Sequence, residues 1–131
     1  MLAALLLGCG SFAAECPIQI TKVDPIAVVF GTTDPWGWEL KVSYKNTGSK
    51  TIVAAKFGAD FIDATGDRRR SAWDYTTTTT VKPNQEKSGH WPDGVYVSEI
   101  GMKVQVSVWL EKAAFSDGSR WEDDGSKSCR R

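Results

Sequence analysis

His90 is the single histidine of the chain, so its neighbours are the first place to look for catalysis. A serine, Ser88, stands two residues before it. Nucleophilic catalysis needs a hydroxyl held against a base, and an acid that orients the base. The surrounding residues are typical of a turn and supply no such acid. We therefore interpret His90 as an exposed loop residue and predict no catalytic residue.

Paired carboxylates are the second candidate for chemistry. Asp60 with Asp63, and Asp123 with Asp124, have the residue type that glycoside hydrolases use as general acid and base. Such pairs are also common on solvated turns, which is the interpretation we adopt. Residues 123–125 lack the ligand pattern of a calcium loop, and one histidine without a cysteine cluster builds no zinc site. The sequence predicts no metal and no cofactor.

Six tryptophans are the strongest signal for binding. Exposed indole rings stack on sugars or peptides and concentrate binding energy. Trp36, at a strand start, and Trp91, in a predicted loop, both stand beside turn residues, so ligand binding and packing remain equally open for them. We take Trp36, Trp91 and the adjoining His90 as the tentative ligand site. Packing is the expected role of the remaining internal tryptophans Trp38, Trp73 and Trp109, although Trp109 interrupts an otherwise polar strand face.

The charge balance excludes whole classes of partner. Sixteen basic and sixteen acidic residues give a formal net charge of zero. Nucleic acids and anionic membranes are bound by proteins with a basic excess, so we expect neither here. Arg68, Arg69 and Arg70 form a local basic run that could contact phosphate. We interpret it as a solvated turn, because three charges on a neutral protein are a weak footprint.

Residues 1–14 differ from the rest of the chain. They carry no charge, and eleven of the fourteen are apolar. A membrane-spanning helix needs roughly 20 apolar residues, so we expect no transmembrane segment. The run matches a secretory signal, with small residues at Ser11 and Ala13 for cleavage. It also resembles a lipobox ending at Cys9, which would then carry a lipid anchor. Both kinds of processing stay open, and residues 15–131 form the predicted mature domain.

Export changes the meaning of the three cysteines. If Cys9 leaves with the signal or carries lipid, Cys16 and Cys129 remain at the two ends of the mature domain. Disulfides persist in oxidising compartments, and the sequence has no Cys-x-x-Cys motif that would favour a redox or metal role. We predict a Cys16–Cys129 disulfide and a secreted, periplasmic or cell-envelope location.

The mature part has the composition of an all-β protein. From Glu15 onward there are eleven Val, six Ile and eleven Thr against two Leu. Stiff β-branched side chains fit a pleated sheet, whereas leucine usually fills helix faces. Apolar and polar residues alternate strictly over 38–45 and 102–110, the period of a half-buried strand. Further strands are predicted for the ranges 18–23, 26–30, 51–63 and 71–81, with a terminal hairpin at 115–121.

The turns between these strands predict their order. Residues 46–49 (Asn-Thr-Gly-Ser) separate two strands and predict a hairpin of 38–45 with 51–63. Residues 64–67, 82–85 and 91–94 are further turn or loop signals. Seven or eight short strands with such turns favour a single antiparallel β-sandwich.

One segment supports a family resemblance. The hairpin Lys-Asn-Thr-Gly-Ser-Lys-Thr-Ile at 45–52 resembles that of exported bacterial immunoglobulin-like domains of the FxLYD kind. Residues 59–63 with the turn 64–67, and the turn 82–86, stand where that family has its namesake stretch and a later Pro-Gly-Glu-like turn. The resemblance covers residues 38–122. It implies an immunoglobulin-like sandwich, an extracytoplasmic module, and no catalytic residues.

The sequence thus predicts a non-catalytic, exported module that binds a protein or a glycan at the bacterial envelope. The alternative is a structural accessory lipoprotein domain with no ligand of its own. A hydrolase would need a carboxylate pair or histidine network that these residues do not form. The identity of the partner and the oligomeric state are not predicted.

Overall fold

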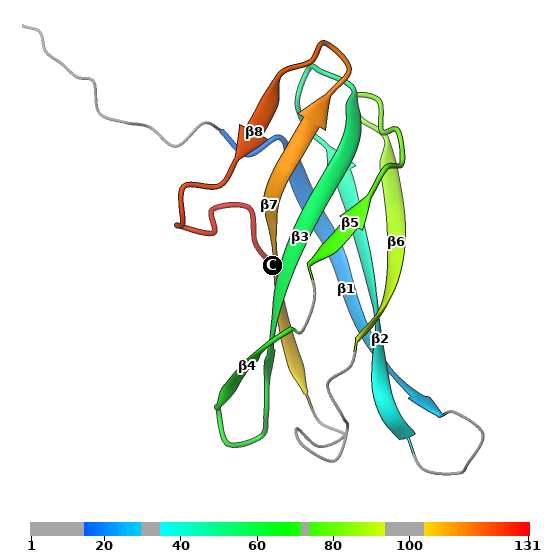
Figure 1. Cartoon of the computed structure of the whole chain (residues 1–131), viewed down its shortest axis with the longest axis vertical. Coiled ribbons are helices and arrows are strands. Elements are labelled where there is room, and N and C mark those ends of the chain that lie inside the picture. The colour runs from blue at the N-terminus through cyan, green and yellow to red at the C-terminus, as the bar shows by residue number, and fades with distance from the viewer. Residues whose placement is uncertain (1–14, 30–34, 72–73, 94–103) are drawn as a thin grey trace, which may run out of the picture.

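The structure is a computed structural model that describes residues 15–29, 35–71, 74–93 and 104–131. In this part of the chain there are eight strands and no helix. They are β1 (Ile18–Val29), β2 (Pro35–Asn46), β3 (Ile52–Ile62), β4 (Arg68–Arg70), β5 (Tyr75–Thr77), β6 (Glu86–Asp93), β7 (Gln105–Phe115) and β8 (Arg120–Glu122). All paired strands are antiparallel, and they form two sheets that face each other (Figure 1). The predicted all-β sandwich is confirmed.

One sheet has three strands in the order β1-β2-β6. The alternation predicted for 38–45 is seen on β2, where Leu40, Val42 and Tyr44 are almost fully buried against the other sheet. β1 is continuous through Pro25, which pairs with Leu40, so the predicted interruption there is wrong. β1 is an edge strand, and a proline is tolerated on an edge because its missing N–H costs no ladder bond there.

The second sheet has five strands, in the order β4-β3-β7-β8 with β5 also paired to β3. β3 and β7 are its long central strands. Phe57 and Phe61 on β3, and Val108 and Leu110 on β7, point inward and are fully buried. The long strand predicted for 71–81 is reduced in the described residues to β5 and an isolated bridge at Val81. The terminal hairpin of β7 and β8 is confirmed, with Gly118 at φ 87° in its turn.

The predicted hairpin between 38–45 and 51–63 is wrong, because β2 and β3 lie in different sheets. Asn46 ends β2 with its backbone N–H still donating to Gln85 at 2.9 Å. Its fully buried side chain donates to the carbonyls of Lys50, at 2.8 Å, and Val81, at 2.9 Å, across the sandwich. A buried amide keeps its hydrogen bonds, so this contact turns the chain at a corner between the sheets.

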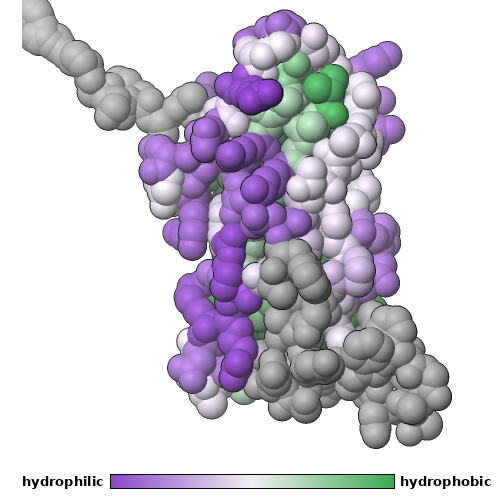
Figure 2. Space-filling view, viewed as in Figure 1, coloured by the Kyte–Doolittle hydropathy of each residue, from purple (hydrophilic) through white to green (hydrophobic). Residues whose placement is uncertain are grey.

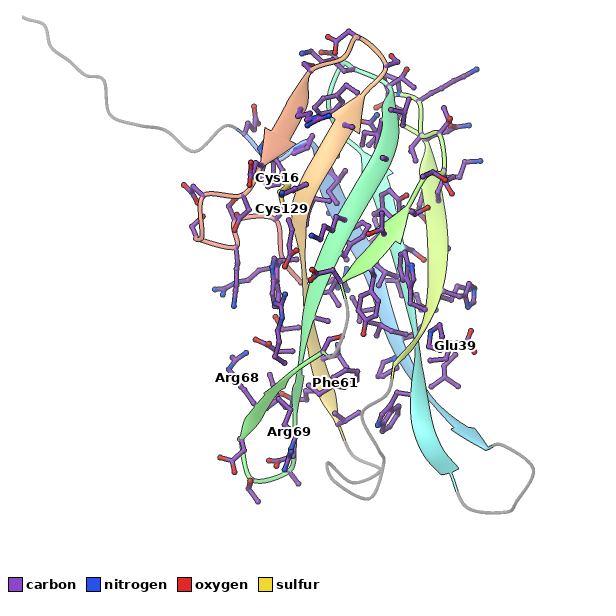
Figure 3. All side chains as sticks on the ribbon, in the orientation of Figure 1. Cys16, Glu39, Phe61, Arg68, Arg69 and Cys129 are labelled. Carbon is purple, nitrogen blue, oxygen red and sulfur yellow. A yellow bond between two sulfur atoms is a disulfide. The ribbon has the colours of Figure 1, made fainter. Side chains whose placement is uncertain are left out.

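The open side of the sandwich beside β1 is closed by the C-terminal segment. Val108 and Arg131 exchange two backbone hydrogen bonds, of 2.9 and 2.8 Å, and Leu110 N donates to Cys129 O at 2.9 Å. Cys129 is bonded to Cys16, which precedes β1 (Figure 3). The Cα atoms of the two cysteines are 5.6 Å apart, within the range of ordinary disulfides. The cysteine pair thus lies at disulfide distance, as predicted, and joins the two sheets.

Candidate interaction face

The outer face of the five-stranded sheet carries several charged side chains that are joined by ion pairs. The pairing of β3 with β7 shifts register twice, between Ile52 and Ala54 and between Lys56 and Phe57. A bulge turns successive side chains to the same side. At the second shift Leu110 lies in the core, while Glu111 and Lys112 contact residues of the outer face. The bulges therefore crowd charged side chains onto this face.

Trp109 lies at the centre of this face. The guanidinium of Arg70 is 4.7 Å from the ring centroid and the Lys127 ammonium is 4.2 Å from it, so both cations lie over the indole. Beneath the ring is Gly58, where a Cβ would approach two ring carbons to 2.7 and 2.8 Å. Only 3% of Trp109 is exposed. We call Gly58, Arg70, Trp109, Glu111 and Lys127 the Trp109 cluster.

Carboxylates neutralise the cations of this cluster. Arg70 donates to Glu111 at 2.8 Å and to Asp74 at 3.1 Å. Asp60, which is 9% exposed, lies 3.5 Å from Arg68 and 3.9 Å from Lys127. Arg68 and Arg70 of the predicted basic run are thus held in ion pairs on β4, rather than free to bind a phosphate. The arginines are exposed, as predicted for a solvated segment, although they form a short strand instead of a turn.

Beside the cluster, toward the β7–β8 turn, the same face is hollowed. A shallow, open depression of about 270 Å³ has a floor of small side chains and a charged rim. Figure 2 shows an apolar patch at this end of the face, with hydrophilic side chains beside it. We call this feature the alanine depression, and it is lined by Ala54, Ala55, Lys56, Thr76, Lys112, Ala113, Ala114, Arg120, Trp121 and Glu122.

The rim of the alanine depression has three cations and one carboxylate, Lys56, Lys112, Arg120 and Glu122. Lys112 lies 3.6 Å from Glu122, and Lys56 lies 3.3 Å from Asp74. Pockets for drug-sized ligands are usually enclosed and measure about 300–1,000 Å³. This smaller, open depression has room for one protruding side chain or one sugar ring, and its rim favours an acidic group.

The tentative ligand residues lie elsewhere, on the three-stranded sheet. His90 is exposed as predicted, but it lies on β6 and not in a loop. Its Nδ1 is 2.8 Å from a carboxylate oxygen of Glu39. Glu39 is thus the side-chain partner of His90. The Ser88 hydroxyl instead contacts the Ser43 hydroxyl, at 2.9 Å. The geometry thus builds no nucleophile–base pair from Ser88 and His90.

Trp91 lies on β6, so the predicted loop at 91–93 is wrong. Its ring turns toward the core, stacks on Tyr75 at 5.4 Å and contacts Phe57 at 5.8 Å between centroids. Its Nε1 donates to Thr76 O at 3.3 Å. The ring also covers Gly89, where any side chain would overlap it. Trp91 therefore has a packing role in the sandwich, although the residue remains partly exposed.

The other tryptophans divide between the core and the undescribed part. Trp38 packs with Phe61 and is 4% exposed, which agrees with the packing role expected for it and for Trp109. Trp36 lies on β2, but its side chain is outside the described residues. Trp73 and Cys9 lie outside the described residues altogether. The ligand role of Trp36 and the lipid on Cys9 stay predictions.

Three of the four aspartates in the two acidic pairs accept hydrogen bonds within turns. Asp63 Oδ1 accepts hydrogen bonds from the Thr65 hydroxyl and from the N–H groups of Thr65 and Asp67, and the Thr65 hydroxyl bond is the main cause that lowers the pKa of Asp63. Asp123 and Asp124 accept from backbone N–H groups that follow them. In residues 15–29, 35–71, 74–93 and 104–131, no three His, Cys, Asp or Glu side chains gather as metal ligands would. The turn interpretation thus holds for Asp63, Asp123 and Asp124 and is wrong for Asp60, which lies on β3 and pairs with Arg68.

Comparison with known proteins supports the fold alone. No family model matches the sequence, and no curated protein matches it. An X-ray structure of a hypothetical protein from Peptoclostridium difficile 630 is similar, with a TM-score of 0.55 at 10% identity, over 84% of this chain and 88% of that one. A target of the Northeast Structural Genomics Consortium has a TM-score of 0.48 at 13% identity, over 84% and 89%. The described residues contain no helix long and apolar enough to cross a membrane.

Proposed function

We propose that this chain is an exported, immunoglobulin-like module of the bacterial envelope that binds a protein or a glycan and catalyses no reaction. The single observation that carries the binding proposal is the alanine depression, a small open hollow with a cationic rim. A partner with a protruding acidic group, such as an acidic side chain or an acidic sugar, complements this rim.

The location and the finer fold belong to the same proposal. A disulfide between Cys16 and Cys129 supports an oxidising compartment, because such bonds are rare in the bacterial cytosol. β2 pairs with β6, and β3 pairs with β7, although the two strands of each pair are distant in sequence. Such pairing supports an immunoglobulin-like topology related to the FxLYD domains. Intact-mass measurement on protein from its native host tests export, since it reveals signal cleavage, lipid on Cys9 and the loss of two thiol protons.

A ligand titration tests the binding face. Amide spectra of ¹⁵N-labelled protein are recorded against acidic and neutral peptides and oligosaccharides. We expect an acidic ligand to shift signals of β3, β7 and β8. The variant Ala114→Glu fills the depression, repels an acidic group, and should weaken that ligand at least about tenfold, which corresponds to about 1.4 kcal/mol. Gln105→Glu adds the same charge to an exposed position at the other end of β7 and is the matched control.

Two outcomes count against the proposal. Absence of binding across the panel favours the alternative, a structural accessory domain without a ligand. Binding that survives Ala114→Glu but is lost in Trp36→Ala would move the site to the tryptophans of the three-stranded sheet. Binding retained in Trp91→Ala would remove Trp91 from the candidate site, in agreement with its packing against Tyr75 and Phe57.

A further inference from the structure

The free edge of β6 carries the pattern of a self-complementary contact. In the three-stranded sheet β6 pairs with β2 alone, and it runs along one rim of the molecule (Figure 1). An edge strand with unpaired N–H and C=O groups is a template for another strand. The register in which β6 pairs with β2 determines which groups of this edge are free to pair with another strand.

The backbone groups that face outward can be identified from the pairing. Asn46 N donates to Gln85 O, so this pair is hydrogen-bonded. Hydrogen-bonded and non-bonded pairs alternate along an antiparallel ladder. The bonded pairs on β6 are therefore Lys87, Gly89 and Trp91 with their β2 partners. Pro92, which has no N–H, then falls at a non-bonded position, as a proline requires.

It follows that Glu86, Ser88 and His90 direct their N–H and C=O groups away from β2. None of these groups makes a backbone hydrogen bond to a described residue beyond the ladder. The side chains of the same three residues are exposed. Both the edge and the adjacent outer face of the sheet are thus accessible at these positions.

We propose that this edge pairs antiparallel with the same edge of a second copy, with Ser88 opposite Ser88 on the two-fold axis. Glu86 of each copy then lies opposite His90 of the other. All three free N–H groups of each copy find acceptors, because the three opposed pairs exchange two hydrogen bonds each. The two three-stranded sheets become one continuous sheet.

Charge and the available N–H groups select this register over its neighbours. A shift that centres the pairing on Glu86 puts two carboxylates opposite each other, and like charges directly opposite on a sheet are destabilising. Registers centred on residue 89 or 90 place Glu86 or Ser88 opposite Pro92, which cannot donate a hydrogen bond. A register centred on residue 87 places His90 opposite Asn84, whose N–H already donates to Asn46 O at 2.8 Å. Only the register centred on Ser88 places Glu86 opposite His90 at both ends.

The outer face around the contact is compatible with it. Within one copy the Nδ1 of His90 contacts Glu39, while Nε2 makes no hydrogen bond to the described residues. That nitrogen is available for Glu86 of the second copy. Lys41 and Lys45 stand opposite His90 and Glu86 on β2, so Glu86 lies between Lys45 of its own sheet and His90 of the second copy. This contact uses the sheet opposite the alanine depression and is independent of the proposed binding function.

The test is sedimentation equilibrium of the whole protein from about 10 μM to 1 mM, because a short strand-to-strand contact belongs to the weak class of interfaces. We expect the average mass to rise toward twice that of the monomer. Ser88→Pro removes the central outward N–H and should abolish the rise. Ser88→Ala also removes the hydroxyl contact with Ser43 but keeps the N–H, so it should dimerise like the parent.

Charge exchange makes the register falsifiable. Glu86→Lys removes the carboxylate that faces His90, and His90→Glu creates two pairs of facing carboxylates, so each should weaken the dimer about tenfold. In a mixture of the two variants, the introduced lysine of one copy lies opposite the introduced glutamate of the other, and the second pair keeps its native groups. The mixture should therefore dimerise again. A parent protein that is monomeric throughout, or a Ser88→Pro variant that dimerises like Ser88→Ala, overturns the proposal. Variants that fail to complement overturn the register.

Discussion

Loss of the Cys16–Cys129 disulfide should strongly destabilise the domain. The bridge closes a loop with a sequence separation of 113. In the chain-entropy model a loop of this length reduces the entropy of the unfolded chain by about 16 cal/mol/K, which is about 4.8 kcal/mol at 25 °C. For a domain of this size the melting temperature should fall by roughly 15–20 °C.

The structure also indicates which part of the chain should lose its hydrogen bonds first when the disulfide is removed. Without the bridge, the C-terminal segment is held by its backbone bonds to Val108 and Leu110 and by exposed side-chain contacts of Lys127 and Arg131. Each such bond contributes only about 1 kcal/mol net, which does not offset the entropy of ordering the segment. We therefore expect the segment to fray while the two sheets stay folded. The Val108 and Leu110 amides should then exchange with solvent faster, whereas the Trp109 amide, opposite Gly58 on β3, keeps its protection.

The assay is urea denaturation and amide exchange of the parent, Cys16→Ala, Cys129→Ala and the double variant. The two single variants and the double variant should lose nearly the same stability, because any one of them removes the whole bridge. The reasoning is refuted if the double variant loses less than about 1 kcal/mol, or if exchange at Val108 and Leu110 is unchanged. Two reactive thiols at Cys16 and Cys129 in the untreated protein would refute the bridge itself.

Three further predictions concern the corner, the Trp109 cluster and an acidic turn. Asn46→Ala should cost about 1–3 kcal/mol in urea denaturation, since it removes two hydrogen bonds of a fully buried amide that contribute about 0.5–1.5 kcal/mol each; Asn46→Asp should cost more, because it puts a carboxylate against the same two carbonyls, and an Asp variant as stable as the parent would contradict the corner role. Gly58→Ala should cost about 1–3 kcal/mol of unfolding free energy, because the added Cβ overpacks against Trp109. The control Gly48→Ala, whose Cβ would meet nothing closer than 3.6 Å, should change stability by less than about 0.5 kcal/mol, and equal losses in the two variants would contradict this reasoning. The Ser119 hydroxyl bond, with Lys50 nearby, lowers the pKa of Asp117 to about 2, so the stability from this carboxylate is complete above its unfolded pKa of 3.8 and is lost as the pH falls toward 2. In a carboxyl NMR titration Ser119→Ala should move that midpoint up toward 3.8, and an unchanged midpoint would contradict the assigned cause.

The strands with strict alternation were predictable. Residues 38–45 and most of 102–110 form β2 and β7, because a period of two needs only one buried face and does not depend on which strand lies alongside. The β7–β8 hairpin was predictable too, since Asp117 and Gly118 suit its short turn locally. The cysteine pairing followed from counting, once residues 1–14 were set apart as a leader.

Partners of the strands were not predictable from the same patterns. An Asn-Thr-Gly-Ser turn fits a hairpin as well as a corner, and the buried contact of Asn46 with Val81 involves residues 35 positions apart. Likewise, Trp91 followed by Pro92 resembles a loop locally, yet an edge strand tolerates the proline and the core accepts the ring. Local turn chemistry is therefore compatible with several long-range arrangements.

The candidate binding face shows the same division. Trp109 was noticeable in the sequence because it broke the polar face of its strand. The two cations that cover its ring, Arg70 and Lys127, come from segments before β5 and after β8, and no local pattern indicates them. The alanine depression has no local signal, since alanines are common in strands and no pattern marks two register shifts on neighbouring strands. Arg120 and Glu122 join its rim only because β8 folds back onto β7.

Composition and alternation were enough for the class of fold, the neutral charge, the cysteine pair and the absence of an evident catalytic motif, because each depends on residue types or on neighbours along the chain. The sheet to which each strand belongs, the burial of Trp91, the Trp109 cluster and the free edge of β6 depend on contacts between residues far apart in the chain. Such contacts arise when the two apolar faces close on each other, and they are selected by packing and by buried hydrogen bonds that no local pattern encodes.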